Sequence, residues 1–170
     1  MSLPSIFTGA ALAIAGRAAL VRLLLVKFRR DVARLNDGDP SSLLAAYADD
    51  AVLRFNDGEH RWAGDWVGKA DIESFLRNYT AAKVQGEIKS IALSGAPWAL
   101  TMLVRFDDNA DGPDGTRLYE NRTVLVIRTR WGKIVDHEDF YVDTSAIADL
   151  EGKLAELGVP VVPRVGATAA

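Results

Sequence analysis

Residues 117–142 read RLYENRTVLVIRTRWGKIVDHEDFYV and decide the fold. Arg117–Arg130 alternates with a period of two over a long run, which predicts an extended strand. Trp131-Gly-Lys133 predicts a hairpin turn, and Ile134–Val142 then forms a second strand. We therefore expect this stretch to form two neighbouring antiparallel strands of one sheet.

Two further strands are predicted upstream of this hairpin. Glu87–Ser94 and Trp98–Phe106 both follow the period of two, and Gly95-Ala-Pro97 between them predicts a turn. Asp107–Gly115, which reads DDNADGPDG, is typical of an acidic hairpin loop. The second half of the chain is therefore expected to contain four long antiparallel strands.

Helical spacing of apolar residues predicts three helices before these strands and one after them. The predicted helices cover residues 20–35, 41–49, 71–79 and 145–157. A short strand, Val52–Phe55, lies between the second and third helices. Helices followed by a curved antiparallel sheet indicate an α+β fold, in which the sheet wraps around the N-terminal helices as a cone and encloses a cavity.

The chain of 170 residues is long enough for one domain with a substantial core. We expect an N-terminal helical extension over residues 1–19, the domain over 20–158 and a flexible tail over 159–170. Residues 1–30 hold five basic side chains and no acid. Arg17 and Arg22 within this apolar segment argue against a membrane-spanning helix. Packing on the domain or on a partner subunit is expected, and contact with a membrane surface is the less favoured alternative.

The composition excludes several kinds of site. The chain has no cysteine and two histidines, His60 and His137, which excludes disulfides and thiolate chemistry and leaves too few ligands for a histidine-rich metal centre. A net charge of -3 argues against broad nucleic-acid binding. We therefore expect a cytoplasmic protein with no cofactor, no metal and no nucleic-acid partner.

Three stretches carry a resemblance to a known family. They are residues 34–52, beginning RLNDGD, residues 68–76, GKADIESFL, and residues 119–144, from Tyr119 to Thr144. In this order they resemble the nuclear transport factor 2-like superfamily, and most of all its SnoaL-like branch of bacterial proteins. The resemblance implies a homodimer whose cone pocket binds a small, mostly apolar molecule.

The ketosteroid isomerase-like members of this superfamily use an aspartate base with a tyrosine and a protonated acid. Aligning Asp49-Asp-Ala51 with their motif places Phe55 at the base, Asp31 at the tyrosine and Leu125 near the acid. Since a phenyl ring cannot accept a proton, the resemblance does not imply isomerase activity of that specific kind.

Polyketide cyclase-like and limonene epoxide hydrolase-like members carry an aspartate shortly after the Gly-Lys-Ile hairpin, and Asp139 matches it. His137 lies two residues earlier, on the same face of the strand, so this pair predicts proton transfer near neutral pH. The epoxide hydrolase-like members also carry an Arg-x-Asp motif on a preceding strand, which aligns with Leu103-Val-Arg105. This stretch supplies an arginine that could position Asp139, but it lacks the second aspartate. A one-residue bulge would turn Glu138 inward instead.

Other side chains are candidates for contact with the ligand. Trp62 and Trp66 are expected to pack in the core or to close the pocket mouth, and Asn121 is expected to bind either a ligand or the sheet edge. The full set of candidate ligand contacts is Phe55, Trp62, Trp66, Tyr79, Leu103, Asn121 and Tyr141.

Two functions remain open from the sequence. One is a cofactor-free acid/base enzyme of the isomerase, cyclase or hydrolase type. The alternative is a non-catalytic ligand-binding or dimerisation module, which the loss of the isomerase base and oxyanion residues favours.

Overall fold

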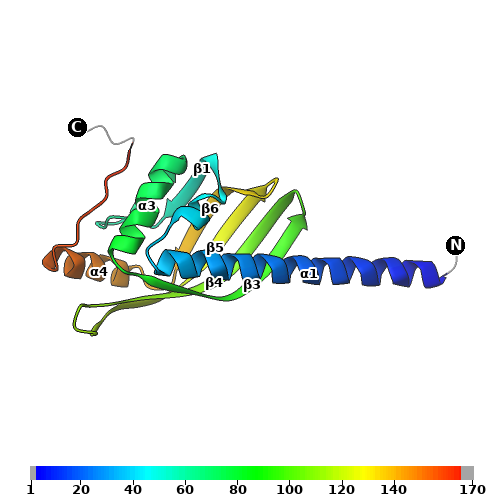
Figure 1. Ribbon diagram of the computed structural model, residues 1–170, viewed down its shortest axis with the longest axis horizontal. Coiled ribbons are helices and arrows are strands. Elements are labelled where there is room, and N and C mark those ends of the chain that lie inside the picture. Colours follow the sequence, from blue (N-terminus) through cyan, green and yellow to red (C-terminus); the bar gives the residue numbers. More distant parts are fainter. Residues whose placement is uncertain (1–2, 166–170) are drawn as a thin grey trace.

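A computed structural model of the protein describes residues 3–165. Its elements, in chain order, are α1 (Leu3–Asn36), α2 (Ser41–Leu44), β1 (Tyr47–Phe55), β2 (Gly64–Val67), α3 (Lys69–Ala81), β3 (Gln85–Ala96), β4 (Ala99–Asp111), β5 (Arg117–Arg130), β6 (Lys133–Tyr141) and α4 (Ser145–Glu156). The six strands form one sheet in the order β2-β1-β6-β5-β4-β3. Figure 1 shows α1, α2 and α3 on one face of this sheet and α4 beyond one end of it. This mixed α+β architecture, with its curved sheet, confirms the predicted fold class.

Strands β3 to β6 pair antiparallel with their neighbours in the chain. Their turns are short, and the β5–β6 hairpin closes through Trp131 and Gly132, which both have positive φ. Two consecutive residues of positive φ are the geometry that matches the twist of a two-residue hairpin. The predicted hairpin therefore forms, with Arg130 opposite Lys133.

The first strand is longer than the sequence predicted, and the second helix is shorter. Helix α2 ends at Leu44, and β1 begins at Tyr47. Strand β1 pairs parallel with β6, far away in the sequence, and buries Tyr47, Ala51 and Leu53. Such long-range pairing overrides the local helical pattern, because sheet contacts and burial outweigh the small differences in intrinsic propensity.

Strand β4 also runs past its predicted end. Its inward residues are Leu100, Met102, Val104, Phe106, Asp108 and Ala110, all buried. The acidic segment predicted as a loop therefore forms strand up to Asp111, and only residues 112–116 connect it to β5. This extension matters for the site, because it carries Asp108 into the sheet.

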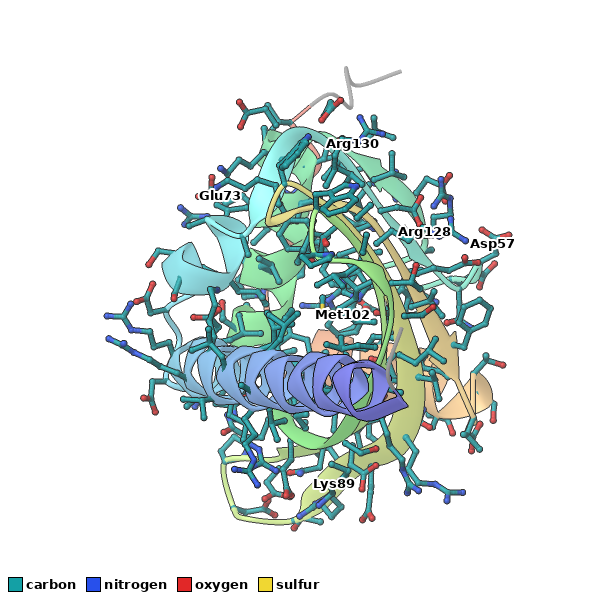
Figure 2. The ribbon with its side chains drawn as sticks, turned by 90° about the vertical axis from the view of Figure 1, so that its right-hand side faces the viewer. Asp57, Glu73, Lys89, Met102, Arg128 and Arg130 are labelled. Atoms are coloured by element: carbon teal, nitrogen blue, oxygen red, sulfur yellow. The ribbon has the colours of Figure 1, made fainter. Side chains whose placement is uncertain are left out.

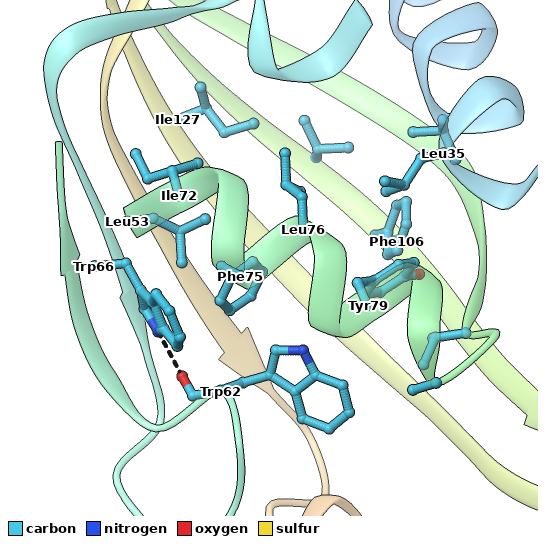
Figure 3. Packing of buried hydrophobic residues seen from close by; sticks show 14 of the residues in the cluster. Leu35, Leu53, Trp62, Trp66, Ile72, Phe75, Leu76, Tyr79, Phe106 and Ile127 are labelled. Carbon is cyan, nitrogen blue, oxygen red and sulfur yellow. Dashed lines mark hydrogen bonds between the residues drawn. The ribbon is translucent and has the colours of Figure 1, made fainter. Parts of the chain in front are cut away.

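The helices pack against the concave face of the sheet. Figure 3 shows the inner side of α3 over this face, with Ile72, Phe75, Leu76 and Tyr79 pointing toward the sheet. At Gly86 of β3 the packing is so close that an added Cβ would lie 2.0 Å from the ring of Phe106. Asn36, the last residue of α1, bonds the backbone N–H and carbonyl of Gly86 through its side chain, at 2.9 Å each. The end of α1 is thereby fixed on β3.

The C-terminal segment up to Val165 is attached to the domain, which corrects the prediction of a loosely held tail for this part. The side chain of Asn78 bonds both the N–H and the carbonyl of Val162. Arg164 bonds the carbonyl oxygens of Ala63 and Asp65, and its guanidinium lies 4.1 Å from the ring centre of Trp66. Residues 166–170 of the predicted tail lie outside the described residues.

Helix α1 is continuous from Leu3 to Asn36, so the predicted extension 1–19 joins the domain without a break where it is described. Its N-terminal part extends past the sheet in Figure 1. Within residues 3–165, no helix combines the length and the apolarity needed to cross a membrane.

Candidate functional site

A cavity lies between the helices and the concave face of the sheet. The space between them is about 660 Å³, a figure that includes its opening to solvent. Figure 2 views the domain with α1 in front and the sheet curving behind it. Apolar side chains from α1, α3 and the sheet form most of the wall, and the polar lining residues are Tyr47, Tyr79, His137, Asp139 and Tyr141. The cavity is therefore mostly apolar, with its polar groups on β1, α3 and β6.

His137 and Asp139 both face this cavity from β6. Arg128 pairs with Asp136 and Thr129 with Ile134, so Val135 is the extra residue of a bulge. Strand β6 thus contains a one-residue bulge. The bulge precedes His137 and Asp139, and Asp139, rather than Glu138, is turned inward. Of the two acids considered, Asp139 is the one that lines the cavity.

The two side chains lie next to each other and form a close pair. Nε2 of His137 is 2.8 Å from Oδ1 of Asp139. Neither of these two atoms has a further hydrogen-bond partner among the described residues.

Tyr47 completes this polar group from β1. Its hydroxyl lies 2.6 Å from Nδ1 of His137. Burial raises the pKa of Tyr47, and the nearby carboxyl of Asp139 raises it further, so Tyr47 keeps its proton. The tautomer of the imidazole decides which of the two groups donates in this hydrogen bond.

A second buried acid, Asp108, lies on β4 where the sequence predicts a loop. Its carboxylate accepts hydrogen bonds from the hydroxyls of Tyr141, at 2.9 Å, and Tyr119, at 3.3 Å. Burial raises the pKa of Asp108 to about 7; the charge of Asp139 adds to this effect, and the tyrosine bonds oppose it. Continuing the alternation of β4 two residues past Phe106 would have found it.

Asp108 lines a smaller compartment, which has room for about one water molecule. Phe75, Tyr79 and Tyr141 line both this compartment and the larger cavity. Of the candidate ligand contacts, Phe55 and Trp62 line the smaller compartment, and Tyr79 and Tyr141 line both. Four of the seven candidate contacts therefore lie at a cavity wall.

Arg105 does not reach Asp139, contrary to expectation. Odd-numbered residues of β4 face outward, so Arg105 lies on the outer face with its guanidinium 3.8 Å from Asp107. Leu103 is exposed on the same face for the same reason. Glu138 also points away from the cavity, since it alternates with His137 and Asp139.

The remaining two candidate contacts have structural partners. Trp66 is buried, and its indole N–H donates to the carbonyl of Trp62 at 2.8 Å (Figure 3). Asn121 donates to the carbonyl of Asp143 and accepts from the Asp143 N–H, which ties β5 to the end of β6. Neither residue lines either cavity. Among residues 3–165, no cluster of histidine and acidic side chains could hold a metal ion.

The cone of helices and curved sheet defines a nuclear transport factor 2-like protein. A family model for the SnoaL-like domain matches residues 28–137, and the chain belongs to this family. No curated protein matches the chain.

Solved structures share this fold at low identity. A nuclear transport factor 2-like protein of unknown function from Burkholderia pseudomallei is 22% identical, with a TM-score of 0.58 over 74% of this chain and 94% of that one. A steroid delta-isomerase from Pseudomonas aeruginosa is 18% identical, with a TM-score of 0.57 over 81% and 90%. TerC, co-crystallised with polyporic acid, is 20% identical, with a TM-score of 0.55 over 72% and 92%. At these identities the likeness shows the fold alone.

Proposed function

We propose that the cone binds a small, mostly apolar molecule and transfers a proton on it without a cofactor. The observation that carries the proposal is the close pair of Asp139 Oδ1 and His137 Nε2, which lie 2.8 Å apart on the wall of an apolar cavity. Neither atom has a further hydrogen-bond partner among the described residues, so a ligand in the cavity would meet both of them.

Each residue of the polar group has a role in this proposal. Asp139 accepts the proton from the ligand, and the Nε2–H of His137 donates to the oxygen on which charge develops. Tyr47 holds the imidazole by its bond to Nδ1 and is a positioning residue. This chemistry fits the isomerase, cyclase or hydrolase type, and the apolar walls exclude the water that would compete for the proton.

Replacing Asp139 with asparagine is expected to slow proton transfer on a bound ketone by about 100-fold, because general-base catalysis contributes at least that much. The α-proton exchange of 2-tetralone in deuterated buffer, followed by NMR, measures this transfer without knowledge of the natural substrate. Binding of the neutral fluorescent probe N-phenyl-1-naphthylamine should remain, since asparagine keeps the shape of the side chain.

Substitutions at two neighbouring positions of β4 test whether the cavity is the binding site. Val104 faces the cavity and Leu103 faces solvent, so Val104→Phe should abolish probe binding and exchange, whereas Leu103→Phe should change neither. Probe binding by the wild type without exchange above the buffer rate would contradict the enzymatic proposal and favour the non-catalytic binding module. Probe binding that survives Val104→Phe would show that the cone is not the site.

We also propose that the protein forms a homodimer through the outer face of its sheet. Leu103, Val124 and Phe140 are exposed there to between 40% and 51%. Val124 pairs with Phe140 on one side and with Arg105 on the other, and Leu103 lies on the neighbouring position of β4. Contiguous apolar side chains in the middle of an exposed sheet face are typical of a protein–protein contact.

Phe140→Glu is expected to convert this dimer to a monomer, because the new charge would be buried without a partner. Sedimentation velocity at micromolar concentration measures the mass. Trp131→Glu is the control, since Trp131 is exposed at the tip of the β5–β6 hairpin, and it should remain dimeric. A monomeric wild type would refute the proposal.

A further inference from the structure

A surface groove lies between α1 and the start of β6. Leu23, Val26, Arg30 and Arg34 line it from α1, and Lys133 lines it from β6. The four α1 residues are spaced by three or four positions, so they share one face of the helix. Leu23 and Val26 are 68% and 67% exposed. Two large apolar side chains therefore lie on the surface beside three basic ones.

The groove is positively charged. Its one acid, Asp31, is 3% exposed and forms an ion pair with Lys27. Within residues 3–165, Arg30, Arg34 and Lys133 form no ion pair. Three positive charges of the groove are thus not balanced by the chain itself, and a partner of complementary charge would be anionic.

Two exposed tryptophans continue this surface. Trp131, which adjoins the groove residue Gly132, is 77% exposed, and Trp98 is 55% exposed. The backbone N–H of Trp131 donates to the carbonyl of Trp98 at 2.9 Å, so the β3–β4 and β5–β6 turns lie side by side at one end of the sheet. Tryptophan is enriched where proteins meet lipid headgroups, because its ring is apolar and its N–H is polar. Exposed tryptophan and leucine next to basic residues are typical of a surface that lies on a membrane.

The groove borders the larger cavity of the cone. Phe28, Leu43, Tyr47 and Ile134 line the cavity, and each is the chain neighbour of a residue that lines the groove. Helix α1 continues from the groove past the sheet (Figure 1), and Figure 2 looks along α1 onto this end of the cone. Since residues 1–30 contain five basic side chains and no acid, the extension adds no charge that would repel an anionic surface.

We propose that the groove, together with Trp98 and Trp131, docks on the surface of an anionic phospholipid bilayer. Arg30, Arg34 and Lys133 contact the lipid phosphates, whereas the apolar side chains of the groove and the two indoles enter the boundary between headgroups and acyl chains. The less favoured of the two roles expected for α1 is therefore the one that its exposed face supports. The docked cone has its cavity beside the phase in which small apolar molecules dissolve best.

Co-sedimentation with large unilamellar vesicles tests the inference on the full chain. One set of vesicles contains phosphatidylcholine alone, and the other contains equal parts of phosphatidylcholine and phosphatidylglycerol. Binding to the anionic vesicles should be about 100-fold tighter than to the neutral ones, because each of three basic residues near an anionic surface contributes about a fivefold factor. High salt should weaken the binding, since it screens these charges.

Charge-matched variants locate the contact. Replacing both Arg30 and Arg34 with glutamine should weaken binding to the anionic vesicles by about 25-fold. Replacing both Arg117 and Lys153 with glutamine removes the same charge near the opposite end of β5. This control pair should bind like the wild type, because the length of β5 exceeds the screening length at physiological salt.

Tryptophan fluorescence distinguishes a lipid surface from any other anionic partner. Trp98 and Trp131 are exposed, whereas Trp62 and Trp66 are buried. Anionic vesicles should shift the emission of the wild type to the blue, and brominated lipids should quench it. A variant with phenylalanine at both exposed positions retains only the buried indoles and should lose the shift and the quenching.

Several results would overturn the inference. They are failure of the wild type to bind anionic vesicles, equal binding to neutral vesicles, and equal losses in the two charge variants. Binding to soluble polyglutamate as tight as to the anionic vesicles, with no quenching by brominated lipids, would identify an acidic protein as the partner instead. Asp139→Asn should bind vesicles like the wild type, because Asp139 does not line the groove. The inference and the proposed proton transfer can therefore fail separately.

Discussion

The free energy of unfolding of the wild type is expected to fall by about 4 kcal/mol as the pH rises from about 4 to about 7, and replacing Asp108 with asparagine is expected to abolish this fall. Burial raises the pKa of Asp108 from 3.8 to about 7. Between these values the folded protein holds a proton that the unfolded chain has released. The free energy of unfolding therefore falls as the pH rises through this window and becomes constant above the folded pKa.

Urea unfolding at several pH values between 4 and 8 measures this effect. The amide of Asp108→Asn cannot ionise but can still accept from Tyr119 and Tyr141, so this variant should lack the slope and be the more stable protein above pH 7. Asp107→Asn, the neighbouring change on the outer face of β4, should keep the wild-type slope. Parallel pH profiles of Asp108→Asn and the wild type would refute the prediction.

The environment of Asp108 also bears on the proposed chemistry. The cone contains two inward carboxyl groups in unlike surroundings, Asp108 between two phenols and Asp139 beside an imidazole. Different environments are how proteins give two similar acids different roles. The pair is therefore suited to combine a proton-accepting group on β6 with a carboxyl on β4 that remains protonated over part of the neutral range.

The fold could be predicted from the sequence because its main signals are local. The alternation of β5 and the turn at Trp131 and Gly132 depend on neighbouring residues, and both appear in the structure where they were expected. Strand β1 could not be delimited in this way. Tyr47 joins it through parallel pairing with Ile134, a contact between segments nearly ninety positions apart in the sequence.

The candidate site was predictable only in part, for the same physical reason. His137 and Asp139 share a face because they are two residues apart on one strand, and the structure places both at the cavity. The inward direction of Asp108 depends on how far β4 extends, and its acidic neighbours indicate a loop. Arg105 was expected to face Asp139, but it lies between the inward residues Val104 and Phe106. Because side chains alternate along a strand, Arg105 points to the opposite face of the sheet.

A large effect on stability is also expected from replacing Arg61, whose side chain is 1% exposed. Its guanidinium bonds both carboxylate oxygens of Glu151 on α4, at 2.8 and 3.1 Å. It also donates to the carbonyls of Val159 and Pro160. Burial opposes ionisation of Glu151, but the bonds from Arg61 outweigh it and lower the pKa of Glu151. One side chain thus joins the loop before β2, α4 and the C-terminal segment.

Arg61→Met is expected to lower the free energy of unfolding by about 3–5 kcal/mol, because it removes the guanidinium from beside Glu151 and leaves two backbone carbonyls without their donor. Urea unfolding at pH 7 measures the loss. Arg77→Met is the matched control: Arg77 forms an exposed pair with Glu73 on α3, and such pairs contribute about 0.5 kcal/mol or less. Equal losses in the two variants would contradict the prediction.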